Sequence, residues 1–103
     1  MVKSEVLDAS ILVEKKFGLT TIFNVIEYPP AFEKCIILWP RKIDFRRALD
    51  VAIKLRKIGK TVSAIDLLTA SICINRNLIL ITKDKDYKNV KIVESKFKLK
   101  LIK

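Results

Sequence analysis

The chain is 103 residues long, half of its residues are hydrophobic, and 21 Lys and Arg against 11 Asp and Glu give it a net charge of +10. The absence of histidine excludes Ser-His and Cys-His catalysis and histidine-bound zinc. No apolar run reaches the roughly 18 residues of a membrane span, and Cys35 and Cys73 lack the spacing of a redox or zinc motif. We therefore expect one domain over residues 1–103, located in the reducing cytoplasm without a membrane partner. The positive charge favours a nucleic-acid partner, although a lysine-rich solvated surface would give the same composition.

The first part of the chain alternates short strand and helix patterns. Apolar runs predict strands at residues 6–7, 19–21 and 35–38. Helix patterns follow the first two strands, at residues 11–16 and 22–28. We expect Gly18 to end the first of these helices and Pro29 to stop the second.

The longer elements come later in the chain. Residues 44–58 predict an amphipathic helix that Asp44 caps and Gly59 ends. Its expected core stripe consists of Phe45, Ala48, Leu49, Ala52, Ile53 and Leu55. Residues 63–76 predict a buried helix, because no charged residue occurs from position 67 to position 75. A buried strand at 78–82, a helical turn at 87–90 and a lysine-faced edge strand at 97–101 complete the pattern.

This alternation predicts a three-layer α/β/α fold with a mostly parallel sheet of four to five strands. In such a sheet every strand-to-helix turn lies at the same edge, where ligand sites form. Four acidic residues from remote segments fall at this edge, namely Asp8, Glu27, Asp66 and Asp84. Each also has a purely structural interpretation: Asp8 as a helix N-cap, Glu27 as a solvated glutamate, and Asp66 as part of a capping box with Ser63.

Carboxylates that converge in this way repel one another unless a cation joins them. Oxygen ligands alone suit a hard ion such as Mg²⁺ or Mn²⁺ rather than zinc. One ion, or two at ~3.5–4 Å, can activate water and stabilise the leaving oxygen of a phosphodiester. An acidic pocket in a strongly basic chain therefore predicts a metal-dependent nuclease.

The same segments resemble the PIN domain in order and position. The resemblance rests on residues 6–10, on Glu27 after a threonine-rich turn, on residues 63–70, and on residues 81–87 with the sequence ITKDKDY. Small PIN proteins of this kind are similar to VapC-type toxins, which are Mg²⁺-dependent endoribonucleases neutralised by a cognate antitoxin. The resemblance implies that Asp8, Glu27, Asp66 and Asp84 are the catalytic acids and that Asp8, Asp66, Asp84 and Asp86 bind the metal. It also implies that Ser10 and Thr82 orient these acids.

The chain departs from the family in its first half, where only 18 residues separate Asp8 from Glu27. PIN toxins place longer helices there, which help to form the dimer face and the antitoxin groove. Apolar surface near Tyr28, Phe32, Trp39 and residues 35–38 is therefore expected to be exposed and to support a homodimer. The alternative to a ribonuclease is a catalytically inactive PIN-like module that binds RNA or protein, and a DNA nuclease is a third interpretation.

Overall fold

The computed structural model describes residues 4–15 and 17–103 and contains a five-stranded sheet in the order β3-β2-β1-β4-β5. All four strand pairs are parallel, which confirms the predicted α/β sheet. The strands are β1 (Glu5–Leu7), β2 (Gly18–Thr21), β3 (Cys35–Leu38), β4 (Ile79–Thr82) and β5 (Lys98–Leu101). Val6 at the centre of β1 pairs with Leu19 on one side and Leu80 on the other.

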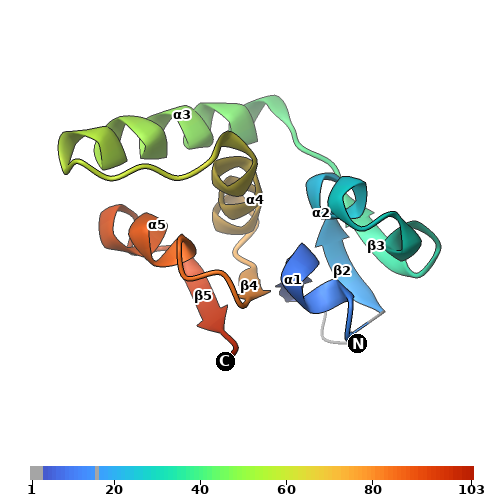
Figure 1. Ribbon diagram of the computed structural model, residues 1–103. Helices are drawn as coiled ribbons and strands as arrows, with labels where there is room; N and C mark the ends of the chain where they lie inside the picture. The colour runs from blue at the N-terminus through green and yellow to red at the C-terminus, as the bar shows by residue number, and fades with distance from the viewer. Residues whose placement is uncertain (1–3, 16) are drawn as a thin grey trace.

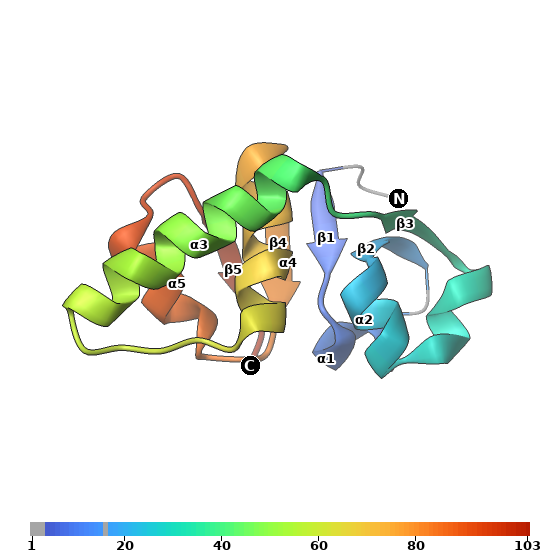
Figure 2. The same cartoon turned by 90° about the horizontal axis from the view of Figure 1, so that it is seen from above.

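Helices cover both faces of the sheet, as the predicted three-layer arrangement requires (Figures 1 and 2). One face carries α3 (Lys42–Lys57), α4 (Ala64–Asn75) and α5 (Tyr87–Val93). The other carries α1 (Ala9–Leu12), α2 (Ile22–Glu27) and the 3₁₀ helix η1 (Pro29–Glu33). Because strand side chains alternate, Val6 and Leu80 pack in the first layer, whereas Leu7 and Ile81 pack in the second.

Helix α4 is the buried helix that its uncharged sequence predicts. Leu67 and every residue from 69 to 74 on it are buried. Ser63 caps the helix, since its hydroxyl accepts a hydrogen bond from the Asp66 N–H at 3.2 Å. The cap fixes the start of α4 at the sheet edge where the strands end, and thereby places Asp66 there.

The expected helix at residues 11–16 is wrong in extent, because α1 comprises a single turn at residues 9–12. Residue 16 lies outside the described residues. Gly18 does not end this helix but begins β2, with φ at +146°. This positive φ favours glycine, and a Cβ at this position would also lie 2.9 Å from Cδ1 of Leu7 on β1.

Helix α3 corrects the expected core stripe. Its buried residues are Asp44, Ala48, Val51 and Leu55, whereas Phe45, Leu49 and Ile53 are about half exposed. The helix contacts α4 and α5 through the buried set, which leaves the three large apolar side chains on a flank that no described element covers. Gly59 ends the helix as predicted, with φ at +73° and with the Lys60 N–H bonded to the Leu55 carbonyl at 3.0 Å.

The N-terminus of α3 is fixed by a buried ion pair. Asp44 is fully buried at the third position of the helix, and its carboxylate accepts hydrogen bonds from the Arg41 N–H at 2.7 Å and the Arg76 guanidinium at 3.0 Å. Asn75 adds a third donor at 2.9 Å. Arg41 rather than Asp44 is the N-cap residue, so the predicted helix start shifts by two residues and Asp44 caps from inside the helix.

Cys73 is buried and Cys35 is half-buried, and no disulfide joins them in the described chain. Within residues 4–15 and 17–103 we find no helix with the length and apolar character needed to cross a bilayer.

Candidate active site

The site lies at the edge where the parallel strands end. Asp8 directly follows β1 and Asp84 comes two residues after β4, and these two strands are neighbours in the sheet. The Asp8 N–H donates to the Ile81 carbonyl at 3.0 Å, so the two strand ends are joined. Asp66 reaches this edge from the first turn of α4, and Glu27 from the last residue of α2.

Ser10 and Thr82 hold Asp8 in a fixed orientation. Both hydroxyls donate to Oδ2 of Asp8 at 2.8 Å. The same two hydroxyls accept hydrogen bonds from the loop that follows β4, Ser10 from the Lys83 N–H and Thr82 from the Asp84 N–H, each at 3.0 Å. Each hydroxyl therefore joins the Asp8 carboxylate to the loop that carries Asp84.

Asp8 has a structural role at the start of α1 and also lies in the acidic cluster. It is the N-cap residue of α1, and Oδ2 also accepts a long hydrogen bond from the Ser10 N–H at 3.4 Å. All of these donors reach Oδ2. The other oxygen, Oδ1, has a single contact in the described chain, a 3.5 Å hydrogen bond from the Tyr87 hydroxyl. Oδ1 is therefore the oxygen with more hydrogen-bonding capacity left for a ligand.

Asp66 is held by the same tyrosine. The Tyr87 hydroxyl donates to Oδ1 of Asp66 at 3.0 Å and so bridges the carboxylates of Asp8 and Asp66. Partial burial raises the pKa of Asp66, the hydrogen bonds from Tyr87 and Ser63 lower it, and the charges of Asp84 and Asp8 raise it further. The charged form of Asp66 is thus disfavoured first by burial and then by the two neighbouring acids.

Glu27 lies on the opposite side of the sheet from α4 yet interacts with the same acids. Its side chain is exposed, and its pKa is raised first by desolvation and then by the charges of Asp8, Asp66 and Asp84. This coupling to all three aspartates brings the four predicted catalytic acids into one electrostatic cluster.

Asp86 contributes differently from the other predicted metal ligands. Its backbone N–H donates to Oδ1 of Asp84 at 2.9 Å, and its own side chain is exposed at the start of α5. Its charge is not among the causes that shift the pKa of Glu27 or Asp66. In the described chain Asp86 therefore orients Asp84 through its main chain.

Sequence reasoning missed Tyr87 as a member of the site, although residue 87 is part of the ITKDKDY segment. The side chain is 1% exposed and its ring packs against Phe97 with the centroids 6.2 Å apart. Burial and the neighbouring carboxylates raise its pKa well above its usual range, so the hydroxyl acts as a permanent donor. One tyrosine in a predicted helical turn gives no sequence signal that its hydroxyl will contact two acids from other segments.

Two more polar residues support the end of β1 and were also missed. The Thr20 hydroxyl donates to the Leu7 carbonyl at 2.6 Å, and the Asn24 amide donates to the same carbonyl at 3.2 Å. Both side chains are buried. Because Leu7 directly precedes Asp8, these bonds fix the backbone from which the Asp8 side chain extends.

The donor set fits a hard divalent cation. It consists of carboxylate oxygens. Burial is the first cause that raises the pKa of Glu27 and Asp66, repulsion from the neighbouring acids adds to it, and a bound cation would relieve that repulsion. Among residues 4–15 and 17–103, however, no group of three or more acidic or cysteine side chains is arranged so that it could hold a metal ion. A cation at these acids would therefore take several of its ligands from solvent oxygens, as is usual for Mg²⁺ in proteins.

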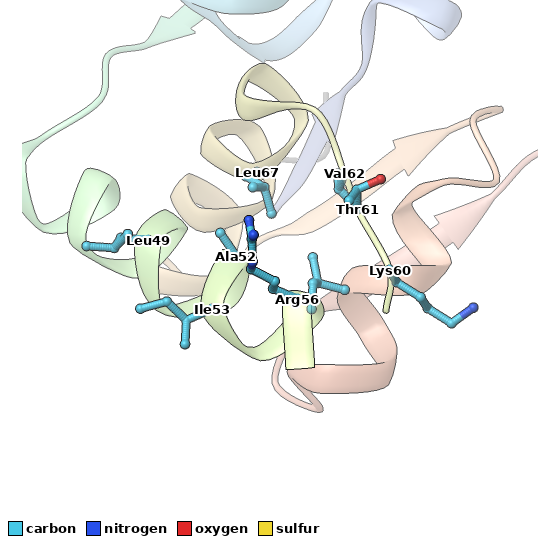
Figure 3. A pocket seen from close by; sticks show the side chains of 9 residues that line it. Leu49, Ala52, Ile53, Arg56, Lys60, Thr61, Val62 and Leu67 are labelled. Atoms are coloured by element: carbon cyan, nitrogen blue, oxygen red, sulfur yellow. The ribbon is translucent and has the colours of Figure 1, made fainter. Parts of the chain in front are cut away.

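A pocket lies away from the acids, between α3 and α4. This pocket has a volume of about 330 Å³ (Figure 3). It is lined by Leu49, Ala52, Ile53, Leu55, Arg56, Lys60, Thr61, Val62 and Leu67. The lining is mostly apolar and holds no carboxylate among the described residues, so this pocket is suited to a protein contact and not to metal chemistry.

Comparison with solved structures places the fold among VapBC proteins. The VapBC-1 structure from nontypeable Haemophilus influenzae aligns with a TM-score of 0.74 and 16% identity over 94% of this chain and 96% of that one. VapBC2 from Rickettsia felis, bound to a DNA fragment from its promoter, gives a TM-score of 0.77 and 14% identity over 96% and 98%. VapBC-5 from Mycobacterium tuberculosis, a toxin-antitoxin system, gives 0.69 and 18% over 97% and 98%.

Comparison with curated proteins gives no match. The family model for the PIN domain matches residues 31–93, which is more than half of the chain and includes the acids at 66, 84 and 86. The chain therefore belongs to the PIN domain family.

Proposed function

We propose that this chain is a Mg²⁺- or Mn²⁺-dependent endoribonuclease of the VapC toxin kind, and that residues 1–103 form one such domain. The observation that carries the proposal is the cluster of Asp8, Glu27, Asp66 and Asp84, which four separate segments bring to one edge of the sheet. The charges of Asp8 and Asp84 add to the raised pKa of Glu27 and of Asp66, and this coupling at a ligand-binding edge favours a catalytic interpretation over four independent structural roles.

In this proposal Asp8, Asp66 and Asp84 hold the cation, with Asp86 as an accessory acid. The bound cation would supply a water nucleophile and neutralise charge at the leaving oxygen. Ser10 and Thr82 keep Oδ2 of Asp8 occupied, so that Oδ1 faces the ion. Glu27, with its raised pKa, is suited to accept a proton from the attacking water.

RNA is the proposed substrate because the chain carries a net charge of +10 around an acidic centre. The solved VapBC structures share the fold and support a toxin role with a cognate antitoxin. We also propose a cytoplasmic location, where such RNA substrates are found.

The test is incubation of the purified protein with structured RNA and with DNA of the same sequence, with Mg²⁺, with Mn²⁺ and with EDTA. We expect cleavage of RNA only, and only with a metal. Preferred cleavage of DNA would reassign the substrate. Binding of RNA without cleavage under all metal conditions would favour the inactive RNA-binding module.

A further inference from the structure

A pocket of about 540 Å³ opens beyond the ends of β4 and β5. It is lined by Lys83, Lys85, Lys88, Leu101, Ile102 and Lys103. Four of the six lining residues are cationic, and none of the described lining residues is acidic. The volume lies in the range of pockets that hold ligands of nucleotide size, roughly 300–1,000 Å³.

The pocket adjoins the strand ends and the loop that carry part of the acidic cluster, because its lining residues Lys83 and Lys85 flank Asp84. Thr82 pairs with Leu101, and the Ile102 N–H donates to the Thr82 carbonyl at 2.8 Å. The Thr82 hydroxyl at the same time binds Asp8. Figure 1 shows the end of β5 next to the end of β4, where the loop to α5 begins. A chain of nucleotides that lies over the acids would therefore reach this pocket.

Three of the four lysines that line the pocket are available for an anionic ligand. Lys83 forms an ion pair with Glu14, whereas Lys85, Lys88 and Lys103 have no carboxylate partner among the described residues. All three are exposed. Cations gathered in one hollow repel one another, and a polyanion that replaces their counterions gains free energy. The half-buried Leu101 and Ile102 add an apolar surface for a sugar or base.

We infer that this lysine pocket binds the phosphates of the RNA strand adjacent to the cleaved bond. The inference rests on the proposed function, since it names the surface that holds the substrate of that same site. The lysines at 83 and 85 alternate with Asp84 and Asp86, so one short loop separates the cations that hold the strand from the acids that act on it.

The experiment measures binding of a fluorescent single-stranded RNA by anisotropy in an Asp8→Asn background, across a series of salt concentrations. The test variant is Lys85→Gln with Lys88→Gln. The control is Lys96→Gln with Lys98→Gln, which removes the same charge from exposed residues at the start of β5, the end of the strand opposite the pocket.

We expect the pocket variant to weaken RNA binding roughly 10-fold near physiological salt and to reduce the slope of log affinity against log salt by about 1.4, that is, about 0.7 for each lost phosphate contact. The control should change affinity less than about 2-fold. Equal losses in both variants, or no loss in either, would overturn the inference.

Two further arms keep the inference separate from the proposed function. Cleavage by the protein with Asp8 intact tests the nuclease, so a protein that binds RNA through the pocket but never cleaves it would refute only the proposed function. Binding of polyglutamate is measured with the same variants. A larger loss of polyglutamate binding than of RNA binding would overturn the inference in favour of an acidic protein segment.

Discussion

At the scale of single residues, Tyr87 is the least expected component of the site. Its hydroxyl lies 3.0 Å from Asp66 and 3.5 Å from Asp8, and it is buried at the point where α5 begins. Hydrogen-bond donors that orient metal-binding side chains typically change metal affinity or activity by roughly 10–100-fold when they are mutated. Tyr87 is therefore a positioning residue in the proposed nuclease.

Tyr87→Phe removes this donor and keeps the aromatic ring that packs on Phe97. We expect Mn²⁺ to bind the variant about 10-fold more weakly, as measured by calorimetry on metal-free protein. The kcat for RNA should fall while its KM stays unchanged, because the lysine pocket is intact. Tyr28→Phe, at a half-buried tyrosine next to η1, serves as the control. Unaltered Mn²⁺ affinity in Tyr87→Phe would contradict the positioning role.

The raised pKa of Asp66 predicts a pH-dependent stability. The native state binds the proton of Asp66 more tightly than the unfolded state does, so this carboxyl lowers stability as the pH rises from its ordinary value of 3.8 through its raised native value. Above this window the metal-free Asp66→Asn variant should melt a few degrees higher than the wild type, and below it the two should converge.

The measurement is thermal melting at a series of pH values, with Asp50→Asn as an exposed control. Excess Mg²⁺ should then stabilise the wild type more than Asp66→Asn, because only the wild type retains the full set of ligands. A variant that melts below the wild type at neutral pH without metal would show that Asp66 stabilises the fold and is not strained by its neighbours.

At the scale of elements, the ion pair between Asp44 on α3 and Arg76 at the end of α4 differs in burial from the other ion pair made by an acid of α3. Asp44 is fully buried and paired with Arg76, while Asp50 on the same helix pairs with Arg46 in solvent. Breaking a buried pair leaves an uncompensated charge, whereas an exposed pair contributes little. The contrast allows two acids of one helix to be compared directly.

Asp44→Ala should lower the free energy of unfolding by about 3 kcal/mol, since it removes both the cap of α3 and the partner of Arg76. Asp50→Ala should lower it by less than about 0.5 kcal/mol. Urea denaturation of both variants checks the difference. Similar values for the two would mean that the Asp44–Arg76 pair does not anchor the helix.

Much of the fold could be predicted from the sequence, because the local patterns there were strong. The uncharged run in α4 and the apolar run in β4 each left one environment possible, namely full burial. The four acids could be placed at one edge of the sheet because the strands were predicted to be parallel, and parallel strands all end at the same edge. Those acids remain a prediction of catalysis until they are tested by mutation.

What could not be predicted depends on contacts between distant segments. An apolar stripe on α3 does not say which part of it faces α4, so Leu49 was assigned to the core although 55% of its surface is exposed. The role of Gly18 depends on the side chain of Leu7, and that of Tyr87 on Asp8 and Asp66. None of these partners is close in sequence.

At the scale of the whole molecule, exposed apolar surface is extensive for a chain of this size. The predicted exposure near residues 28–39 is confirmed for Phe32, Ile36 and Trp39, each more than half exposed. Helix α3 adds a second exposed surface with Phe45, Leu49 and Ile53. Leu49 and Ile53 line the pocket that Figure 3 shows, and Phe45 and Leu49 line a neighbouring hollow. Such patches mark sites of protein association.

The surface near residues 28–39, where the sequence predicts the dimer interface, is exposed, but the larger apolar hollows lie at α3, so we predict the homodimer through the α3 surface instead. Leu49 and Ile53 line a hollow of about 330 Å³, and Phe45 and Leu49 line one of about 240 Å³, so a second copy related by a two-fold axis can pack its own α3 surface across them. Leu49→Asp should shift the protein to monomer in light scattering at high concentration, and Ile36→Asp on β3 should not. Wild-type protein that stays monomeric would remove the dimer, and a dimer lost only with Ile36→Asp would move the interface to β3.

The initial rate of RNA cleavage by the wild type, by Asp8→Asn and by Asp50→Asn at one Mg²⁺ concentration decides whether these acids catalyse the reaction. We expect a loss of at least roughly 100-fold in Asp8→Asn, because a direct ligand should cost no less than the roughly 10–100-fold typical of groups that only support one, and an unchanged rate in Asp50→Asn. Excess EDTA should abolish cleavage by the wild type. Cleavage that persists undiminished in EDTA, or in Asp8→Asn, would contradict a metal-dependent reaction at these acids.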